Sequence, residues 1–176
     1  MFSACGYYSL KGSLPAGVNS IYVSSITNNT SEFTLTEKLN EIFIANLISK
    51  NILKLKYDDS ADSRLDIIIT KMSDQPSVVS NKLIEAEFVE EWKFKISVSF
   101  IWTNNITNKE IINKNIASWG LYGTGQDIGS DGIDNDSDNL IDSEDSDEFG
   151  LPRESAMKIA IEKVANEIIN ELISTW

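Results

Sequence analysis

Ten acidic side chains and no lysine or arginine lie between Asp127 and Glu148, in the stretch DIGSDGIDNDSDNLIDSEDSDEFG. With Asp134 as the first position of a twelve-residue calcium loop, carboxylates occupy every position at which such a loop needs one. Hard oxygen ligands at these intervals converge on one calcium ion. The predicted ligands are Asp134, Asp136, Asp138, the backbone carbonyl of Leu140, Asp142 and Asp145. Asn139 stands where glycine is usual, and asparagine tolerates a left-handed backbone better than most residues.

This acidic segment is similar to the aspartate-rich repeats of thrombospondin type 3 and dockerin modules, which implies calcium as its ligand. The alternative is a solvated acidic loop, since so many aspartates make a chance match easier. Asp145 replaces the bidentate glutamate of the last position, so we expect a weak site that needs millimolar calcium. The flanking residues 123–125 and 148–150 do not predict the helix pair of an EF-hand.

Cys5 is the only cysteine, and it follows Phe2, Ser3 and Ala4. Small residues precede the lipid-accepting cysteine in bacterial lipoprotein signals, although Phe2 stands where leucine is usual. The charged and apolar regions of such a signal are missing from this sequence. Either the chain begins late in its precursor, or the match is accidental and the thiol is inert. We expect residues 1–17 to hold the end of a lipoprotein signal, a lipidated Cys5 and a tether.

The composition excludes several classes of function. There is no histidine, so neither a Cys/His zinc cluster nor the commonest general base is present. The net charge is −12, yet outside the acidic segment 17 acidic residues face 15 basic ones, with no basic stripe for nucleic acid. No apolar run reaches the length of a membrane-spanning helix. The acidic side chains cluster in one segment rather than across a pocket, so we do not expect an enzyme.

Hydrophobic periodicity predicts strands at 18–27, 52–57, 64–72, 84–102 and 110–121. In the segment 84–102, apolar residues share one parity, with Glu90 as the single exception, and Glu, Lys and Ser share the other, so one face is expected to be buried and the other exposed to solvent. Thr34 and Glu37 predict a capping box that begins a helix, and Pro152 predicts the start of a second helix. The apolar positions of the two helices are Leu35, Leu39, Ile42, Phe43 and Leu47, then Met157, Ala160, Ile161, Val164, Ala165, Ile168 and Leu172.

This order of elements predicts an α/β fold, a two-layer sandwich. Two helices would pack on one face of a four-stranded mixed sheet that contains a long hairpin. The strand at 64–72 is apolar on both sides and is expected in the interior of the sheet. Residues 18–176 would form a single domain, with the acidic segment inserted at 123–150.

The chain resembles the LPS-assembly lipoprotein family, LptE, whose mature chains commonly begin Cys-Gly-Tyr. Here Cys5, Gly6 and Tyr7 are followed by Gly12, Leu14 and Pro15. Residues 26–32, which read ITNNTSE, are similar to the family's F-x-N-x-T-S-E turn before its first helix, with Ile26 in the place of phenylalanine. The order of elements agrees as well, and the resemblance covers nearly the whole chain except the acidic segment.

The resemblance implies an outer-membrane lipoprotein, anchored on the periplasmic face by lipid on Cys5. Family members plug a large β-barrel partner of the LptD type, help it assemble and help deliver lipopolysaccharide to the outer leaflet. They contact lipopolysaccharide phosphates through basic residues. Lys93, Lys95, Lys109 and Lys114 lie on or near the predicted hairpin, but none maps onto a family position, and a solvated strand face is the better explanation for each of them. The sequence therefore leaves the lipopolysaccharide contacts unassigned.

Trp92, Trp102 and Trp119 are expected in the core or at a sheet edge rather than at a lipid contact. The alternative function is a calcium-dependent envelope interaction or adhesion lipoprotein, in which the acidic segment makes the contact. Chelation of calcium would abolish binding only in that alternative.

Overall fold

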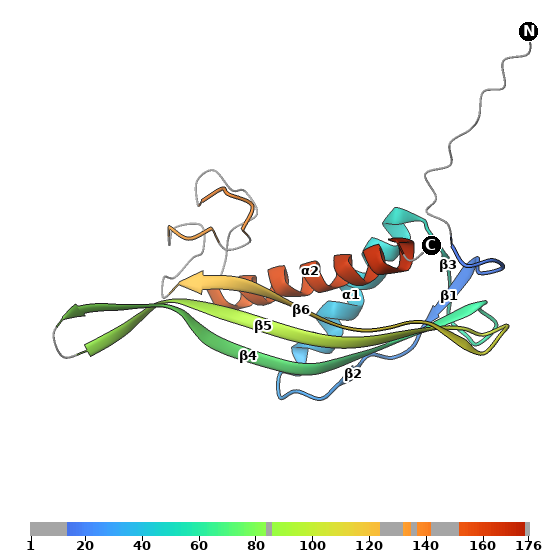
Figure 1. Ribbon diagram of the computed structural model, residues 1–176, viewed down its shortest axis with the longest axis horizontal. Coiled ribbons are helices and arrows are strands. Elements are labelled where there is room, and N and C mark those ends of the chain that lie inside the picture. The colour runs from blue at the N-terminus through green and yellow to red at the C-terminus, as the bar shows by residue number, and fades with distance from the viewer. Residues whose placement is uncertain (1–13, 84–85, 124–131, 135–136, 142–151, 175–176) are drawn as a thin grey trace, which may run out of the picture.

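The computed structural model describes residues 14–83, 86–123, 132–134, 137–141 and 152–174, with backbone alone for the strand residues from 78 to 90 (Figure 1). These residues form six strands and two helices, which are β1 (Ser20–Val23), β2 (Thr27–Asn28), α1 (Thr34–Lys50), β3 (Lys54–Lys56), β4 (Ser63–Leu83), β5 (Ala86–Asn104), β6 (Lys109–Gly123) and α2 (Pro152–Ser174). The sheet order is β3-β1-β4-β5-β6, and β2 pairs with β4 beyond the end of β1. Both helices lie on the same side of the sheet (Figure 1).

The predicted two-layer α/β arrangement is confirmed, but the prediction of four strands was wrong, since the described residues form six. The expected strand at 18–27 is split into β1 and β2. At the break the Ser24 hydroxyl donates to the Asp66 carboxylate at 2.7 Å, while the Ser24 N–H donates to the Leu65 carbonyl. These bonds tie the connecting residues to β4 without a regular ladder.

Strand β4 is central, as predicted, with parallel β1 and β2 on one edge and antiparallel β5 on the other. It continues to Leu83, eleven residues beyond the predicted end at Met72. The added part contains Ser73, Asp74, Gln75 and Pro76, which hide the strand pattern in the sequence. Pairing with the long β5 holds this part in the sheet despite several register shifts.

The alternation of β5 is confirmed where its side chains are described, since Phe94, Ile96, Val98, Phe100 and Trp102 are all buried. The predicted hairpin of β5 and β6 is also present, and its turn contains Asn108 in the left-handed region with φ of 53°. Ala86, Phe88 and the exception Glu90 belong to the part without described side chains, and Ile84 lies outside the described residues.

Helix α1 begins at Thr34 as expected, but the predicted capping box of Thr34 and Glu37 was wrong. Phe33 is the N-cap residue and makes no side-chain cap, while the Thr34 hydroxyl donates to Glu32. The predicted apolar faces are confirmed: Leu35, Leu39, Phe43 and Leu47 are buried, Ile42 is partly buried, and all seven predicted positions of α2 are buried.

Helix α2 approaches β6 at backbone distance. A Cβ atom placed on Gly120 would lie 2.3 Å from the carbonyl oxygen of Ala156. The pair of small residues therefore sets the position of the first turns of α2 over the end of β6.

Candidate functional site

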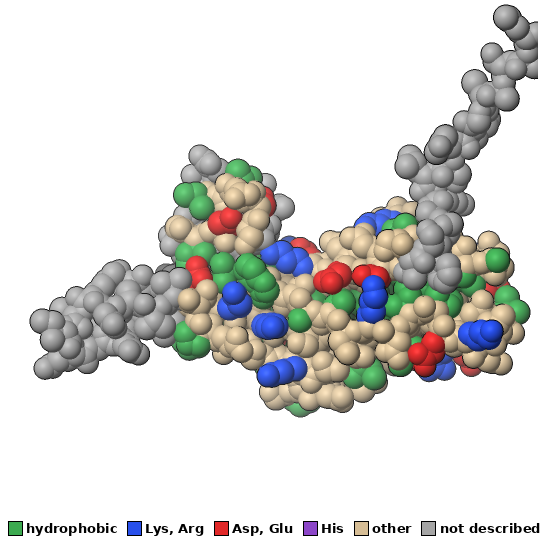
Figure 2. Space-filling view, viewed as in Figure 1, with side chains coloured by type: hydrophobic (Ala, Val, Ile, Leu, Met, Phe, Trp, Pro, Cys, Tyr) green, Lys and Arg blue, Asp and Glu red, His purple; other side chains and the backbone are tan. Residues whose placement is uncertain are grey.

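The open face of the sheet, opposite the helices, carries a group of lysines around one tryptophan. Lys93 and Lys95 alternate with the buried Phe94 and Ile96 and so point to this face. Lys71 is paired with Ser97 in the ladder and lies diagonal to Lys95. We call Lys71, Lys93, Lys95 and Trp119 the lysine surface. Figure 2 shows Lys and Arg side chains gathered where β4, β5 and β6 run side by side.

Lys95 lies between the other two lysines of the surface. Lys93 and Lys95 are two residues apart on one strand, and diagonal neighbours such as Lys71 and Lys95 have Cα atoms about 7–8 Å apart. Within the described part of the chain none of the three makes an ion pair, and the nearest acid along β5 is Glu91. The surface is therefore a local concentration of positive charge on a chain of net charge −12.

Trp119 lies on the edge strand β6, directly opposite Lys95. The Lys93 ammonium is 4.4 Å from the centre of its ring, and the Lys163 ammonium of α2 is 5.1 Å away. Such contacts with a ring face hold an ammonium group by cation–π attraction. The half-buried indole thus orients two cations at the edge of the sheet.

Of the four lysines singled out by the sequence, only Lys93 and Lys95 belong to this surface. Lys114 lies on the helical side, where it pairs with Glu171 of α2, and Lys109 begins β6 beside the turn. Lys71 was missed because a register shift at Thr70 reverses the alternation of β4 and turns Lys71 away from the helices. Lys163 was missed because its place depends on how α2 packs beside β6.

The tryptophan predictions hold in part. Trp102 is fully buried, and its indole N–H has no hydrogen-bond partner among the described residues. Trp92 stacks on Tyr122, with ring centres 6.4 Å apart. Trp119 is at the sheet edge, as expected, but it contacts lysines there.

Three of the six predicted calcium ligands, Asp136, Asp142 and Asp145, lie outside the described residues, as does Cys5. The Asp134 carboxylate accepts N–H groups from Ser137, Asp138 and Asn139 at 2.6–3.1 Å. Asn139 has φ of 75°, so the left-handed backbone predicted at this position is present. In the described stretches no three acidic side chains are grouped to hold a metal.

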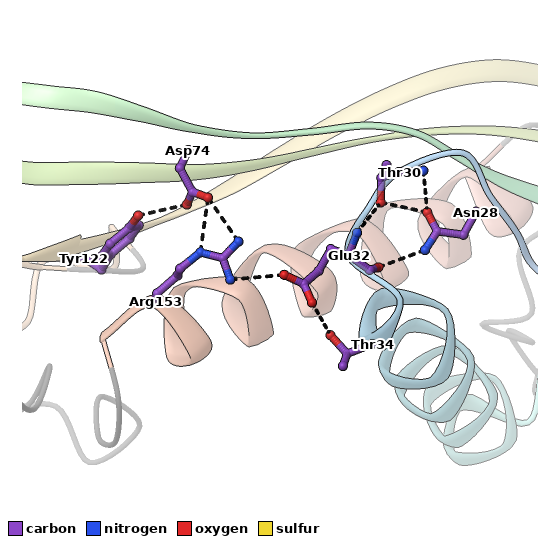
Figure 3. A network of polar contacts seen from close by, with 7 residues as sticks. All are labelled: Asn28, Thr30, Glu32, Thr34, Asp74, Tyr122 and Arg153. Carbon is purple, nitrogen blue, oxygen red and sulfur yellow. Dashed lines mark hydrogen bonds and ion pairs between the residues drawn. The ribbon is translucent and has the colours of Figure 1, made fainter.

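A polar network fastens both ends of the acidic insertion to β4 (Figure 3). Tyr122, near the end of β6, donates its hydroxyl to Asp74 at 2.9 Å. Arg153, near the start of α2, donates two N–H groups to Asp74 at 3.1 Å and one to Glu32 at 3.2 Å. One carboxylate therefore joins the residues that precede and follow the insertion.

The Asn-x-Thr-Ser-Glu turn supplies the other half of this network (Figure 3). Asn28 accepts the N–H and hydroxyl of Thr30 through its Oδ1 and donates through Nδ2 to the Glu32 carbonyl. The Glu32 N–H donates to the Thr30 hydroxyl. This closed turn aims the Glu32 carboxylate at Arg153 and positions the start of α1.

The network also shifts the pKa of two ionisable groups. Burial, together with the Asp74 carboxylate, raises the pKa of Tyr122 to about 12. Burial alone would lower the pKa of Arg153, but Asp74 and Glu32 raise it above its ordinary value. The guanidinium is charged at any physiological pH, so its role here is to neutralise two carboxylates.

No protein-family profile and no curated protein sequence matches the chain. Solved structures do match. A protein from Xanthomonas campestris superposes with a TM-score of 0.57 at 9% identity, over 92% of this chain and 87% of its own. An uncharacterised lipoprotein B from Nitrosomonas europaea superposes with a TM-score of 0.54 at 14% identity, over 98% of this chain and 90% of its own. A hypothetical protein from Chlamydia trachomatis superposes with a TM-score of 0.51 at 9% identity, over 88% of this chain and 98% of its own.

At these identities the likeness shows the fold alone. The chain has a fold that a bacterial lipoprotein also adopts. Among the described helices, none is long and apolar enough to cross a membrane.

Proposed function

We propose that the protein is an outer-membrane lipoprotein of the LPS-assembly type, anchored on the periplasmic face by lipid on Cys5. Its open sheet face binds the phosphate groups of lipopolysaccharide, and the domain supports an LptD-type β-barrel that exports this lipid. The fold of a known bacterial lipoprotein, the Cys-Gly-Tyr start and the Asn-x-Thr-Ser-Glu turn support the assignment. The observation that carries it is the lysine surface.

The chemistry of the surface fits a phosphorylated glycolipid. Lysine is a point charge suited to phosphate, and the three ammonium groups, which pair with no carboxylate in the described part of the chain, can donate hydrogen bonds to anionic oxygens. The adjoining Trp119 offers a flat apolar face for a sugar ring or an acyl chain. A single inorganic phosphate would use only part of this arrangement, whereas a head group with two phosphates would span it.

Binding to lipid A micelles provides the test. Replacing Lys93 and Lys95 by glutamine should weaken binding about tenfold at 0.15 M salt, because two exposed ionic contacts are lost at up to about 1 kcal/mol each. The control is the double change Lys50→Gln and Lys54→Gln, which removes the same charge elsewhere. Dephosphorylated lipid A should bind equally to all variants. Equal affinity of the three proteins for phosphorylated lipid A would refute the role of the lysine surface.

The anchor and the barrel need separate measurements. Mass spectrometry of native material should show an acylated Cys5, and an unmodified cytosolic chain would remove the lipoprotein assignment. The native protein should co-purify with a large β-barrel in detergent extracts. If no barrel is recovered, the assembly role fails while the lipid-binding role is still tested by the micelle experiment.

A second candidate function, a calcium-dependent envelope interaction module, is favoured by the backbone of residues 134 and 137–139. A first aspartate that accepts several loop N–H groups and a left-handed sixth residue suit a calcium loop. Calcium titration by calorimetry should give a Kd of about 0.1–1 mM, as for extracellular modules. Asp136→Asn with Asp138→Asn should abolish the heat of binding, whereas Asp131→Asn with Asp147→Asn, which lie outside the ligand positions, should preserve it. Equal loss in both variants would indicate only a diffuse acidic attraction.

A further inference from the structure

Two turns at one end of the sheet are joined by hydrogen bonds and carry exposed apolar side chains. The Asn105 backbone N–H donates to the Asp62 carbonyl at 2.9 Å, and the Asn105 side-chain amide donates to the Ala61 carbonyl at 3.0 Å. Tyr57 begins the first turn and is 85% exposed, while Ile106 in the second is 65% exposed. We call residues 57–62 and 105–108 the turn end.

The chain enters the fold at this same end (Figure 1). The Asn19 N–H donates to the Asp62 carboxylate at 3.0 Å, and the Asn19 carbonyl accepts the N–H of Lys54. Leu14, the first described residue, packs partly against the core. Cys5 precedes Leu14 by nine residues, which span at most about 30 Å. A lipid on Cys5 would therefore keep Leu14, which lies where the chain enters the fold at the turn end, within about 30 Å of the bilayer surface.

We propose that the turn end rests on the bilayer that holds the lipid anchor, with Tyr57 and Ile106 at the boundary between head groups and acyl chains. This inference rests on the proposed lipid attachment of Cys5. Tyrosine suits that depth because its ring is apolar and its hydroxyl stays in water. An exposed isoleucine gains free energy there because its side chain leaves water.

Charge around the turn end is balanced, unlike that of the lysine surface. Four basic residues lie on these turns and strand starts, which are Lys54, Lys56, Arg64 and Lys109, and they are accompanied by four acidic ones, Asp58, Asp59, Asp62 and Glu110. The contact therefore depends on apolar burial and not on anionic lipid. Two side chains alone bind weakly, but a short tether raises the effective concentration of the bilayer to about the millimolar range.

The contact would also orient the domain. Strands β4 and β5 run from the turn end to the far end of the long hairpin near Leu83 (Figure 1). With the turn end on the bilayer, that hairpin points away from it.

The single cysteine allows a direct test on the full chain. Coupling Cys5 to a maleimide phospholipid in phosphatidylcholine vesicles reproduces the anchor without native acylation. Amide hydrogen exchange in the two turns should slow at least about fivefold relative to the uncoupled chain, and 0.5 M NaCl should not restore the faster exchange rate. Exchange in residues 29–33, at the other end of α1, should be unchanged.

Tyr57→Ser with Ile106→Ser should return exchange in the turns to the uncoupled rate. The matched control is Phe33→Ser, which removes a side chain 84% exposed at the other end of α1 and should preserve the protection. Circular dichroism of each variant checks the fold. Unchanged exchange in the turns of the coupled wild-type chain would overturn the proposal. A native Cys5 without lipid would instead refute the anchor, whatever the coupled protein shows.

Discussion

Replacing Arg153 by alanine probes the network that closes the base of the acidic insertion (Figure 3). The change removes two hydrogen bonds to Asp74 and one to Glu32, together with a guanidinium that lies 5.3 Å from the centre of the Phe94 ring. It leaves the two carboxylates near one another without a cation. Tyr122 still donates to the other oxygen of Asp74, so this carboxylate keeps one hydrogen bond.

The exposure of these groups sets the magnitude. The side chain of Arg153 is 38% exposed, and those of Asp74 and Glu32 are 25% and 24% exposed. An exposed ion pair contributes at most about 1 kcal/mol, whereas breaking a buried pair costs about 3–5 kcal/mol. The intermediate burial here predicts that Arg153→Ala lowers the free energy of unfolding by about 2 kcal/mol. Solvent screening should limit the coupling of Arg153 with Asp74 to about 1 kcal/mol.

Urea unfolding of the single variants Arg153→Ala and Asp74→Asn and of the double variant measures both values. The control is Lys158→Ala, since Lys158 pairs with Glu162 at 3.8 Å on the exposed side of the same helix and should matter by less than about 0.5 kcal/mol. If Arg153→Ala and Lys158→Ala prove equally mild, the network does not hold the base of the insertion. Additive single changes would mean that Arg153 and Asp74 do not interact.

Two further predictions concern packing and pH. Gly120→Ala should lower the free energy of unfolding in urea by about 3 kcal/mol, because the added carbon meets the backbone of Ala156, which no rotamer change relieves. The control Asn115→Ala, at an exposed position of the same strand, should change the stability little. A Gly120→Ala protein of normal stability would contradict the close approach. Because the pKa of Tyr122 is about 12 in the folded state and about 10 when unfolded, its contribution to stability is complete below pH 10 and is lost as pH rises towards 12, by at most about 1.4 kcal/mol per pH unit. Between pH 9 and 12 the free energy of unfolding should therefore fall more steeply for the wild-type protein than for Tyr122→Phe. Parallel curves for the two proteins would exclude this contribution.

Elements with strong periodicity could be predicted from the sequence. The two helices and β5 bury one uninterrupted apolar face each, so the pattern alone indicates their type and their buried side. Strand β4 shows why prediction failed elsewhere. Its second half is held by pairing with β5, and register shifts break the alternation that would have revealed it. The break at Ser24 adds a strand, because it divides the expected strand at 18–27 into β1 and β2, whereas the longer β4 adds length but no strand.

The candidate site was predictable only where it follows one strand. Lys93 and Lys95 alternate with buried residues of β5, and their face can be inferred from the sequence. Lys71 reaches the surface through a bulge, and Lys163 reaches Trp119 through the packing of α2. The pair of Asp74 and Arg153 joins residues 79 positions apart in the sequence. No local pattern encodes such contacts, because they depend on how the layers assemble.

The Asn-x-Thr-Ser-Glu turn, on which the family resemblance partly rests, has a definite structural role in this chain. Hydrogen bonds of Asn28 and Thr30 close the turn, and the Glu32 carboxylate forms an ion pair with Arg153 at the start of α2. The residues that suggested the resemblance thus connect the first helix to the last one. Their spacing is required for this connection, since a one-residue change would point the carboxylate elsewhere.

In the proposed binding of lipid phosphates, the lysine surface would act locally, because the net charge of −12 opposes any anionic ligand at long range. At 0.15 M ionic strength the screening length is about 8 Å, similar to the Cα spacing of Lys95 from each of Lys71 and Lys93. A phosphate in contact with these ammonium groups therefore feels their charge far more than that of acids several screening lengths away. Lowering the salt concentration extends the reach of those acids as well as that of the lysines. Phosphorylated lipid should thus bind with a weaker salt dependence than a uniformly basic protein would show, since the two contributions change in opposite directions.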